Sequence, residues 1–225
     1  MQIQVHLAAL QNADSFFPGG GSAFSWGLET LLADRQVRSP DDLAVLLAGQ
    51  LEQRWAVSDR PALVLAFRAA DDLARVGRID RELEAMMLAQ ELREGSKRAG
   101  AASLAVHERI GTPGAAAYRA AIRAGSALGH LPVVQAVVWR GAGLDEVAAQ
   151  ASSAHTFCIA LLGAALRLGA VGHLQSQAIL LGLREVIAGL IAAPVPALEE
   201  LYTCTPAIEV AAMRHEVQSS RVFAN

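Results

Sequence analysis

The feature that most constrains the fold is a long stretch almost free of charge. Residues 147–183 include one charged side chain, Arg167. A helix in this stretch is apolar or small on nearly all faces, so neighbouring elements must bury it. The sequence therefore predicts a central helix, with Gly169 and Gly172 ending it and opening the next one.

The uncharged part of this stretch, residues 147–166, is also long enough to suggest a membrane span. Five polar side chains lie inside it, at Gln150, Ser152, Ser153, His155 and Thr156. Each of these groups is costly in hydrocarbon. We therefore interpret the segment as the core helix of a soluble domain and expect no membrane partner.

Length and composition favour one large helical domain. The chain has 225 residues, its hydrophobic residues are mostly Ala and Leu, and aromatic residues make up 5%. Such a composition favours closely packed helices over sheets. We predict an all-α, single-domain bundle of roughly ten helices around the central apolar helix. It spans residues 1–212, and residues 213–225 form a polar tail with too few apolar side chains to fold alone.

Charge and residue usage exclude several classes of function. A net charge of −3 gives no electrostatic footprint for nucleic acid. The two cysteines have no metal spacing, the six histidines include no close pair, and no cofactor motif is found. The N-terminus lacks the basic region of a signal peptide, so we expect a cytoplasmic protein with reduced thiols.

Caps and prolines predict the helix boundaries. Ser39-Pro40 opens one helix, and Asp59-Arg60-Pro61 opens a second that Gly77 closes, which predicts a helical hairpin. Residues 79–110 then suggest one long helix, and Pro132 starts a short buried helix.

A glycine-rich loop follows the first predicted helix at residues 14–27. Glycines leading into a helix can hold an anion on backbone N–H groups, but a phosphate loop also needs Lys followed by Ser or Thr. Here Gly21 is followed by Ser22 and Ala23. A tight turn that lets helices pack closely is the better interpretation.

Both ends of the chain carry motifs that resemble the UreF family of urease accessory proteins. The N-terminal signature comprises Asp14, Ser15, Phe17, Pro18, Gly20, Gly21, Ser25, Gly27, Leu28 and Glu29. The C-terminal signature comprises Met213, Arg214, His215, Glu216, Gln218, Ser220, Arg221 and Phe223. Internal landmarks follow in the family's order at Arg93-Glu94 through Gly100, Gly129–Pro132 and Arg167–Gly169. The resemblance covers essentially the whole chain.

The resemblance implies an all-α homodimer without catalysis of its own. UreF-like proteins bind the accessory protein UreD, also called UreH, and together these recruit the GTPase UreG so that nickel reaches apo-urease. The family's C-terminal tail is held to order on UreD and to help form the UreG-docking surface. The residues that we expect to bind a partner in this chain are Arg214, His215, Glu216, Gln218, Ser220, Arg221 and Phe223. Of these, Arg214, Glu216 and Arg221 would make charge-assisted hydrogen bonds, and Phe223 would be an apolar anchor.

Several positions depart from the family pattern. Similar proteins tend to have His or Tyr at Phe24, Thr at Gly19, and often Thr and an aromatic residue at Val217 and Ser219. No polar contact is expected at these positions here. A regulatory variant of the same hypothesis has an arginine such as Arg221 acting in trans on GTP hydrolysis by UreG.

Two alternative classes of function remain. In the first, the protein is a metal- or small-molecule-binding bundle in which four side chains face an interior pocket, namely His130, His155, His173 and Cys158. In the second, it is a helical hydrolase, for which the sequence offers no candidate carboxylate.

Overall fold

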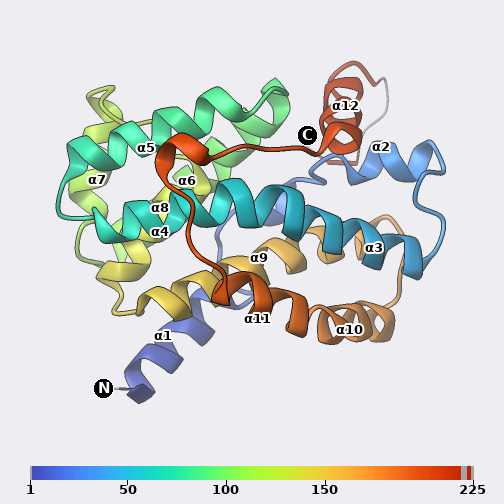
Figure 1. The fold of residues 1–225 in the computed structure, drawn as a ribbon, viewed down its shortest axis with the longest axis horizontal. Helices are drawn as coiled ribbons and strands as arrows, with labels where there is room; N and C mark the ends of the chain where they lie inside the picture. The colour runs from blue at the N-terminus through green and yellow to red at the C-terminus, as the bar shows by residue number, and fades with distance from the viewer. Residues whose placement is uncertain (1, 219–221, 224–225) are drawn as a thin grey trace.

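Twelve α-helices make up the described part of the chain, residues 2–218 and 222–223 of a computed structural model, and no strand occurs within these ranges (Figure 1). The all-α prediction is confirmed. In chain order the helices are α1 (Gln2–Ala13), α2 (Leu28–Ala33), α3 (Pro40–Gln50), α4 (Arg60–Arg68), α5 (Leu73–Met86), α6 (Gln90–Arg109), α7 (Ala115–Arg123), α8 (Leu131–Gly141), α9 (Glu146–Arg167), α10 (His173–Gly182), α11 (Arg184–Ala192) and α12 (Pro206–His215). Two 3-10 turns, η1 (Gly21–Ala23) and η3 (Leu198–Glu200), and the π-helix η2 (Leu51–Asp59) complete the fold.

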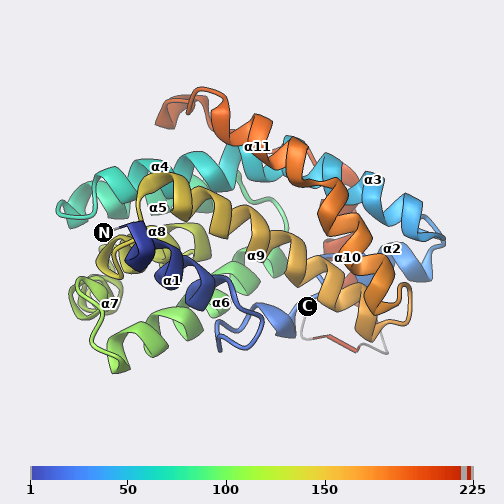
Figure 2. The same cartoon turned by 90° about the horizontal axis from the view of Figure 1, so that it is seen from below.

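The predicted central helix is α9. It begins with Asp145, whose side chain accepts a hydrogen bond from Ala148 N, and it ends before Gly169, which adopts a φ of +70°. Figure 2 shows α1 lying along α9, and α9 also packs against α4, α8, α10 and α11. Such surroundings explain how an almost uncharged helix is stabilised in this protein.

Two hydrophobic cores lie side by side in the bundle. One gathers buried residues from α2, α3, η2, α9, α10 and α12 and from the start of α6, and the other from α4, α5, α7, α8 and the rest of α6. Helix α9 contributes Cys158 and Leu161 to the first core and Ala149 to the second. The segment 40–68 likewise places Leu47 in the first and Leu63 in the second. Two helical rods therefore run through both cores.

The predicted hairpin at Asp59-Arg60-Pro61 is wrong, because α3, η2 and α4 form one continuous helical rod. Asp59 keeps helical angles, with φ −64° and ψ −45°. In an ordinary α-helix the ring of Pro61 would clash with the carbonyl four residues back. Here the turn is widened, and Arg60 N donates to the carbonyl of Trp55, five residues back. The π-helix thus accommodates a proline that sequence rules treat as a helix start.

Carbonyl groups of the π-helix are used by a distant segment. Tyr202 N donates to the carbonyl of Val57 at 3.3 Å, and Cys204 N donates to that of Gln53 at 3.1 Å. The side chain of Arg60 donates to the carbonyls of Ile191 and Ala193 at the end of α11, at 3.1 and 2.6 Å. These bonds hold the extended connection between α11 and α12 against the rod.

The helix predicted over 79–110 is interrupted. The chain is extended at Met87 (ψ 105°) and Ala89 (ψ 124°), so α5 and α6 are separate helices. Arg93 donates to the carbonyls of Met87 and Leu88 and satisfies them at the break. Gly77, expected to close a helix, lies inside α5, where a Cβ would come within 2.2 Å of the carbonyl oxygen of Ser126. Neither glycine nor proline marks the break, which explains why the sequence pattern misses it.

The second half of the uncharged stretch is not buried as predicted. Helix α10 buries only Ser176 and Ile179, and α11 buries none of its residues. Segments 146–167 and 173–192 both have the length and hydropathy of a membrane span, but half of the apolar window is buried in the first and 17% in the second. Leu174 and Leu181 are 87% and 59% exposed. An apolar face of α10–α11 therefore lies on the surface, beside α3 and η2 (Figure 1).

Candidate functional site

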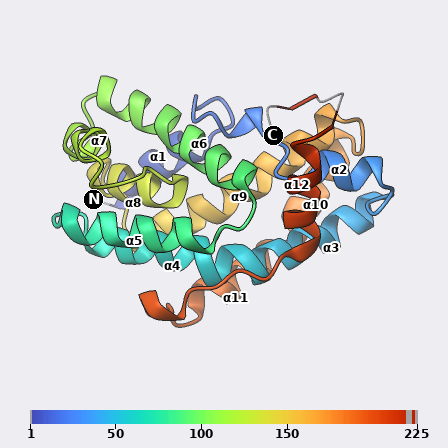
Figure 3. The same ribbon diagram turned by 90° about the horizontal axis from the view of Figure 1, so that it is seen from above.

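The two signatures meet at a buried histidine of α12. His215 is 0% exposed, and its ring lies between two carboxylates. Nδ1 is 3.0 Å from Glu91 Oε1 of α6, and Nε2 is 3.1 Å from Glu29 Oε2 of α2. The ring therefore links α12 to α6 through one nitrogen and to α2 through the other. Figure 3 shows α12 beside α2.

Glu29 also holds the chain beyond α12. Its Oε1 accepts a hydrogen bond from Val222 N at 2.7 Å, and its Oε2 accepts one from Phe223 N at 3.2 Å. Gln218 Nε2 donates to Thr30 Oγ1 at 3.1 Å. The Glu29 carboxylate of the N-terminal signature thus binds His215 and Phe223 of the C-terminal signature, and also Val222 N.

Helix α12 continues for three residues past Ala212, where the tail was predicted to begin. Residues 213–215 are helical, and Phe223 is 8% exposed within the first hydrophobic core. The guanidinium of Arg167 lies 4.5 Å from the centre of the Phe223 ring. The described part of the tail therefore packs on its own chain, and Phe223 can anchor a partner only by leaving this site.

Other side chains of the C-terminal signature point outward. Arg214 is half-exposed and donates to both carboxylate oxygens of Asp34. Glu216 and Val217 are exposed, Val217 by 84%. Met213 and Val222 are 42% and 70% exposed. Ser220, Arg221 and the departure position Ser219 lie outside the described residues.

The rest of the N-terminal signature forms a wall of a cavity. Residues 14–21 all line it, including Asp14, Ser15, Phe17, Pro18, Gly20 and Gly21. Gly20 has a φ of +74°, and a Cβ there would lie 2.8 Å from the Cβ of Ala102 on α6. The prediction of a close approach is confirmed at this glycine.

Ser25 and the departure position Phe24 lie away from this wall and are buried. Ser25 is 0% exposed and Phe24 3%. The ring of Phe24 lies 5.3 Å from that of Trp26 and faces Gly95 of α6. Gly19 lines the cavity, and a Cβ there would meet only Phe17. The environment of Phe24 is apolar, in agreement with the expectation that this position makes no polar contact.

A buried histidine supports the loop and makes it sensitive to acid. His107 of α6 is 1% exposed, its ring lies 5.3 Å from that of Phe17, and its Nε2 has no partner among the described residues. Burial lowers the pKa of His107 from 6.5 to about 4. Between these values the unfolded chain binds a proton that the folded chain excludes. The contribution of neutral His107 to the free energy of unfolding is therefore fully present above pH 6.5. It is lost as the pH drops toward 4, by up to about 3 kcal/mol.

We expect His107→Gln to flatten this part of the pH profile. Urea unfolding at pH 7.5, 5.5 and 4.5 measures the slope, and His173→Gln, at an exposed position, is the control that should keep it. A slope unchanged by His107→Gln would contradict the assignment.

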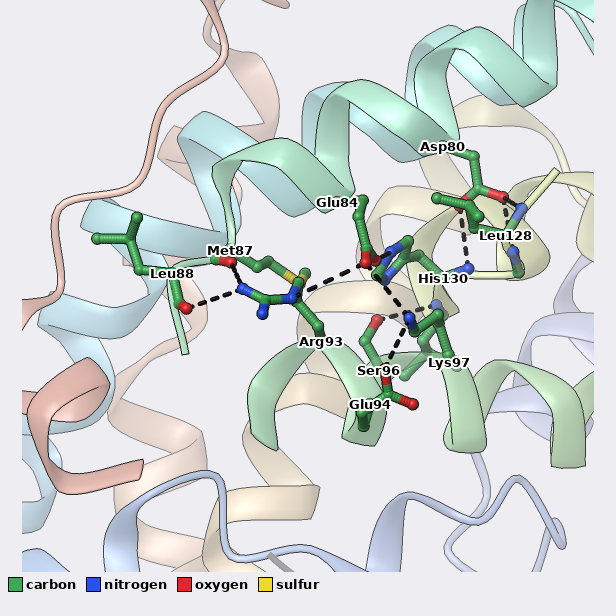
Figure 4. A network of polar contacts seen from close by, with 12 residues as sticks. Asp80, Glu84, Met87, Leu88, Arg93, Glu94, Ser96, Lys97, Leu128 and His130 are labelled. Atoms are coloured by element: carbon green, nitrogen blue, oxygen red, sulfur yellow. Dashed lines mark hydrogen bonds and ion pairs between the residues drawn. The ribbon is translucent and has the colours of Figure 1, made fainter. Parts of the chain in front are cut away.

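A second polar cluster joins α5, α6 and the start of α8 (Figure 4). His130 Nε2 lies 2.6 Å from Glu84 Oε2, and Lys97 Nζ lies 3.3 Å from Glu84 Oε1. Ser96 Oγ accepts a hydrogen bond from Leu131 N at 3.1 Å. His130 is 0% exposed, and its bond to Glu84 ties the start of α8 to α5. The Ser96–Leu131 bond also joins two of the internal landmarks, the one at residues 93–100 and the one at residues 129–132.

The hypothesis of a pocket lined by four ligand side chains is wrong in its choice of residues. His130 is committed to Glu84, and His173 is exposed. Burial raises the pKa of the Cys158 thiol to about 12 and lowers that of His155, which Arg184 lowers further. None of the four lines the cavity. Across residues 2–218 and 222–223, no group of three or more His, Cys, Asp and Glu side chains could hold a metal ion.

Sequence reasoning named the signatures but missed their partners. Glu91, Thr30 and Asp34 receive the C-terminal signature, and nothing in their local sequence distinguishes them from surface polar residues. The one signal in the sequence is that the tail has few apolar side chains. Such a tail has to be held by polar contacts, but the sequence does not say with which residues. Pairing over such sequence distances depends on the tertiary fold.

Comparison with known proteins identifies close similarity to one family. The UreF family model matches residues 37–184. The urease accessory protein UreF of Trichodesmium erythraeum (strain IMS101) is 34% identical, and the alignment covers 99% of this chain and 98% of that protein. The UreF proteins of Paenarthrobacter aurescens (strain TC1) and Actinobacillus pleuropneumoniae serotype 3 (strain JL03) are 32% and 30% identical, over 99% and 96% of this chain and 99% and 97% of their own lengths.

Proposed function

Because this chain belongs to the UreF family of urease accessory proteins, we propose that it is a non-enzymatic scaffold for urease maturation. In this proposal it acts in the cytoplasm and binds a UreD (UreH) protein. The two together recruit the GTPase UreG to apo-urease for assembly of the nickel centre. The family resemblance of both signatures supports this role, and their convergence on Glu29 gives it a structural basis.

One observation carries the proposal. The C-terminal signature has an inner side held by Glu29 and an outer side that is left to solvent. The outer side, which we call the tail surface, consists of Met213, Glu216, Val217 and Val222. Three apolar side chains exposed within ten residues, around one carboxylate, form a small patch suited to a protein partner. We propose that UreD contacts this patch.

The double variant Met213→Asp/Val217→Asp should abolish co-purification with UreD and UreG from the same organism. Both side chains are exposed, so the free energy of unfolding should change by less than about 0.5 kcal/mol. Ile110→Asp introduces one such charge at a side chain that is 59% exposed, at the C-terminal end of α6, and it should preserve assembly.

A chain ending at Ala212 should also fail to assemble the three proteins. It removes His215 from the interior as well, so the double variant is the sharper test. Assembly by both altered chains would contradict docking through the tail.

We further propose that the protein is a homodimer formed through the α10–α11 face. Leu174, Ala178, Leu181, Ala188 and Ala192 are exposed on these two helices. Few charged groups interrupt the face, since α10 carries none and α11 begins with Arg184 and Glu185. A second copy placing the same face against it would bury both, as a two-fold interface requires.

Leu181→Arg should convert the dimer to a monomer, because it places a charge in the centre of the apolar face. Light scattering coupled to size-exclusion chromatography should then give half the wild-type mass. The control Ile110→Arg should retain the dimer. A dimeric Leu181→Arg protein would place the interface elsewhere.

A further inference from the structure

The scaffold function leaves one cavity unused. It has a volume of about 480 Å³ and lies between residues 14–21, η2, α6, α8 and α9. Aromatic and aliphatic side chains form much of its wall, including Trp26, Trp55, Phe157 and Leu161. A cavity of this size, with apolar and polar side chains on its wall, has the build of a small-molecule site.

A buried arginine faces this cavity. Arg54 of η2 is 6% exposed and lines the wall, and its guanidinium lies 5.7 Å from the centre of the Trp26 ring and 6.0 Å from that of Phe157. Its nearest carboxylate is Asp59, whose Oδ2 is 3.6 Å from Arg54 Nε. Among the described residues Arg54 donates no hydrogen bond, although a guanidinium carries five N–H groups. Its N–H groups can therefore bind an acceptor that enters the cavity.

Two further buried polar side chains on the same wall lack partners. Gln135 of α8 is 6% exposed and Ser103 of α6 is 4% exposed. Within the described ranges neither takes part in a hydrogen bond. Together with Arg54, these side chains give the cavity wall three groups that can form hydrogen bonds with an occupant.

We propose that the cavity binds a small organic carboxylate, held by the guanidinium of Arg54, with its apolar body against Trp26 and Phe157. The two terminal nitrogens of Arg54 form a fork that matches a carboxylate, because Asp59 faces Nε. Gln135 and Ser103 add hydrogen-bond donors.

Titration of the full chain with 4-fluorobenzoate, followed by ¹⁹F NMR, tests this inference. We expect saturable one-to-one binding that acetate and hexanoate compete for. Loss of the charge-assisted fork in Arg54→Gln should weaken binding by about tenfold or more. The neutral analogue 4-fluorobenzamide should bind the wild-type protein more weakly by a similar factor.

A second variant guards against misfolding of Arg54→Gln. Gly163 lines the cavity, and a Cβ built there meets no atom within 4 Å, so Gly163→Leu fills space without touching Arg54. It should also weaken binding, while Gly49→Leu, at an equally open helical glycine outside the cavity, should not. Arg167→Gln tests the other arginine of the wall and should leave the affinity within about twofold, because Arg167 is exposed.

Three results would overturn the inference. They are absence of saturable binding to the wild-type chain, unchanged affinity in both Arg54→Gln and Gly163→Leu, and equal affinity for 4-fluorobenzoate and 4-fluorobenzamide. Since the probe is a small molecule and the tail surface is not altered, these results are independent of assembly with UreD and UreG.

Discussion

Asp80→Ala is expected to lower the free energy of unfolding by about 4 kcal/mol or more. Asp80 is 0% exposed and accepts four hydrogen bonds. Tyr118 Oη donates at 2.8 Å. The backbone N–H groups of Leu128, Gly129 and His130, in the turn before α8, donate at 2.6, 2.6 and 3.0 Å (Figure 4). The alanine variant leaves these donors unpaired in the interior, and each such group costs about 1–3 kcal/mol.

Urea unfolding monitored by circular dichroism measures this loss. Asp80→Asn should have an intermediate cost, because its amide keeps one acceptor oxygen. The control is Asp71→Ala, whose side chain is 87% exposed and pairs with Arg140, and it should change stability by less than about 1 kcal/mol. Equal costs for Asp80→Ala and Asp71→Ala would show that the turn before α8 does not depend on this carboxylate.

Gly100→Ala is expected to cost about 2–3 kcal/mol by forcing α6 away from the turn before α8. A Cβ at Gly100 would lie 2.1 Å from the carbonyl oxygen of Gly129 and 3.1 Å from a methyl group of Val134. A backbone oxygen cannot rotate away, so the helices must separate. In most helix interiors the same change is stabilising, since glycine is a poor helix former.

Gly163→Ala provides the matched comparison. It lies in α9 with open space at its Cβ position, and it should raise the free energy of unfolding by about 0.5–1 kcal/mol. Thermal unfolding of the two variants should therefore shift in opposite directions. A stabilising Gly100→Ala would mean that α6 and the Gly129 turn are farther apart than described.

The elements that depend on local rules could be predicted from the sequence. The central helix α9 follows from the lack of charge over residues 147–166, and α8 follows from Pro132 and the apolar run after it. The start of α3 follows from Ser39, whose hydroxyl accepts a hydrogen bond from Asp42 N. In each case the signal and the structure lie within one or two helical turns of each other.

Other elements depend on distant partners and could not be predicted. Pro61 continues a helix because a π-turn precedes it and residues 202–204 use the carbonyls of Gln53 and Val57. The break at residues 87–89 depends on Arg93 reaching back across it.

The candidate site shows the same limit. The signatures identified His215 and Glu29 separately, but their contact spans 186 positions of sequence, and no local pattern encodes it. The outward direction of Met213 and Val217, and the inward direction of Phe223, follow from that contact.

The two rods that pass through both hydrophobic cores have a mechanical consequence. Neither core can melt without fraying a helix that the other core needs, so the whole bundle should unfold in a single cooperative transition. For the same reason no flexible joint separates the half that carries the tail surface from the half that does not. Two partners bound at opposite ends of the bundle would therefore be held at a fixed separation and orientation.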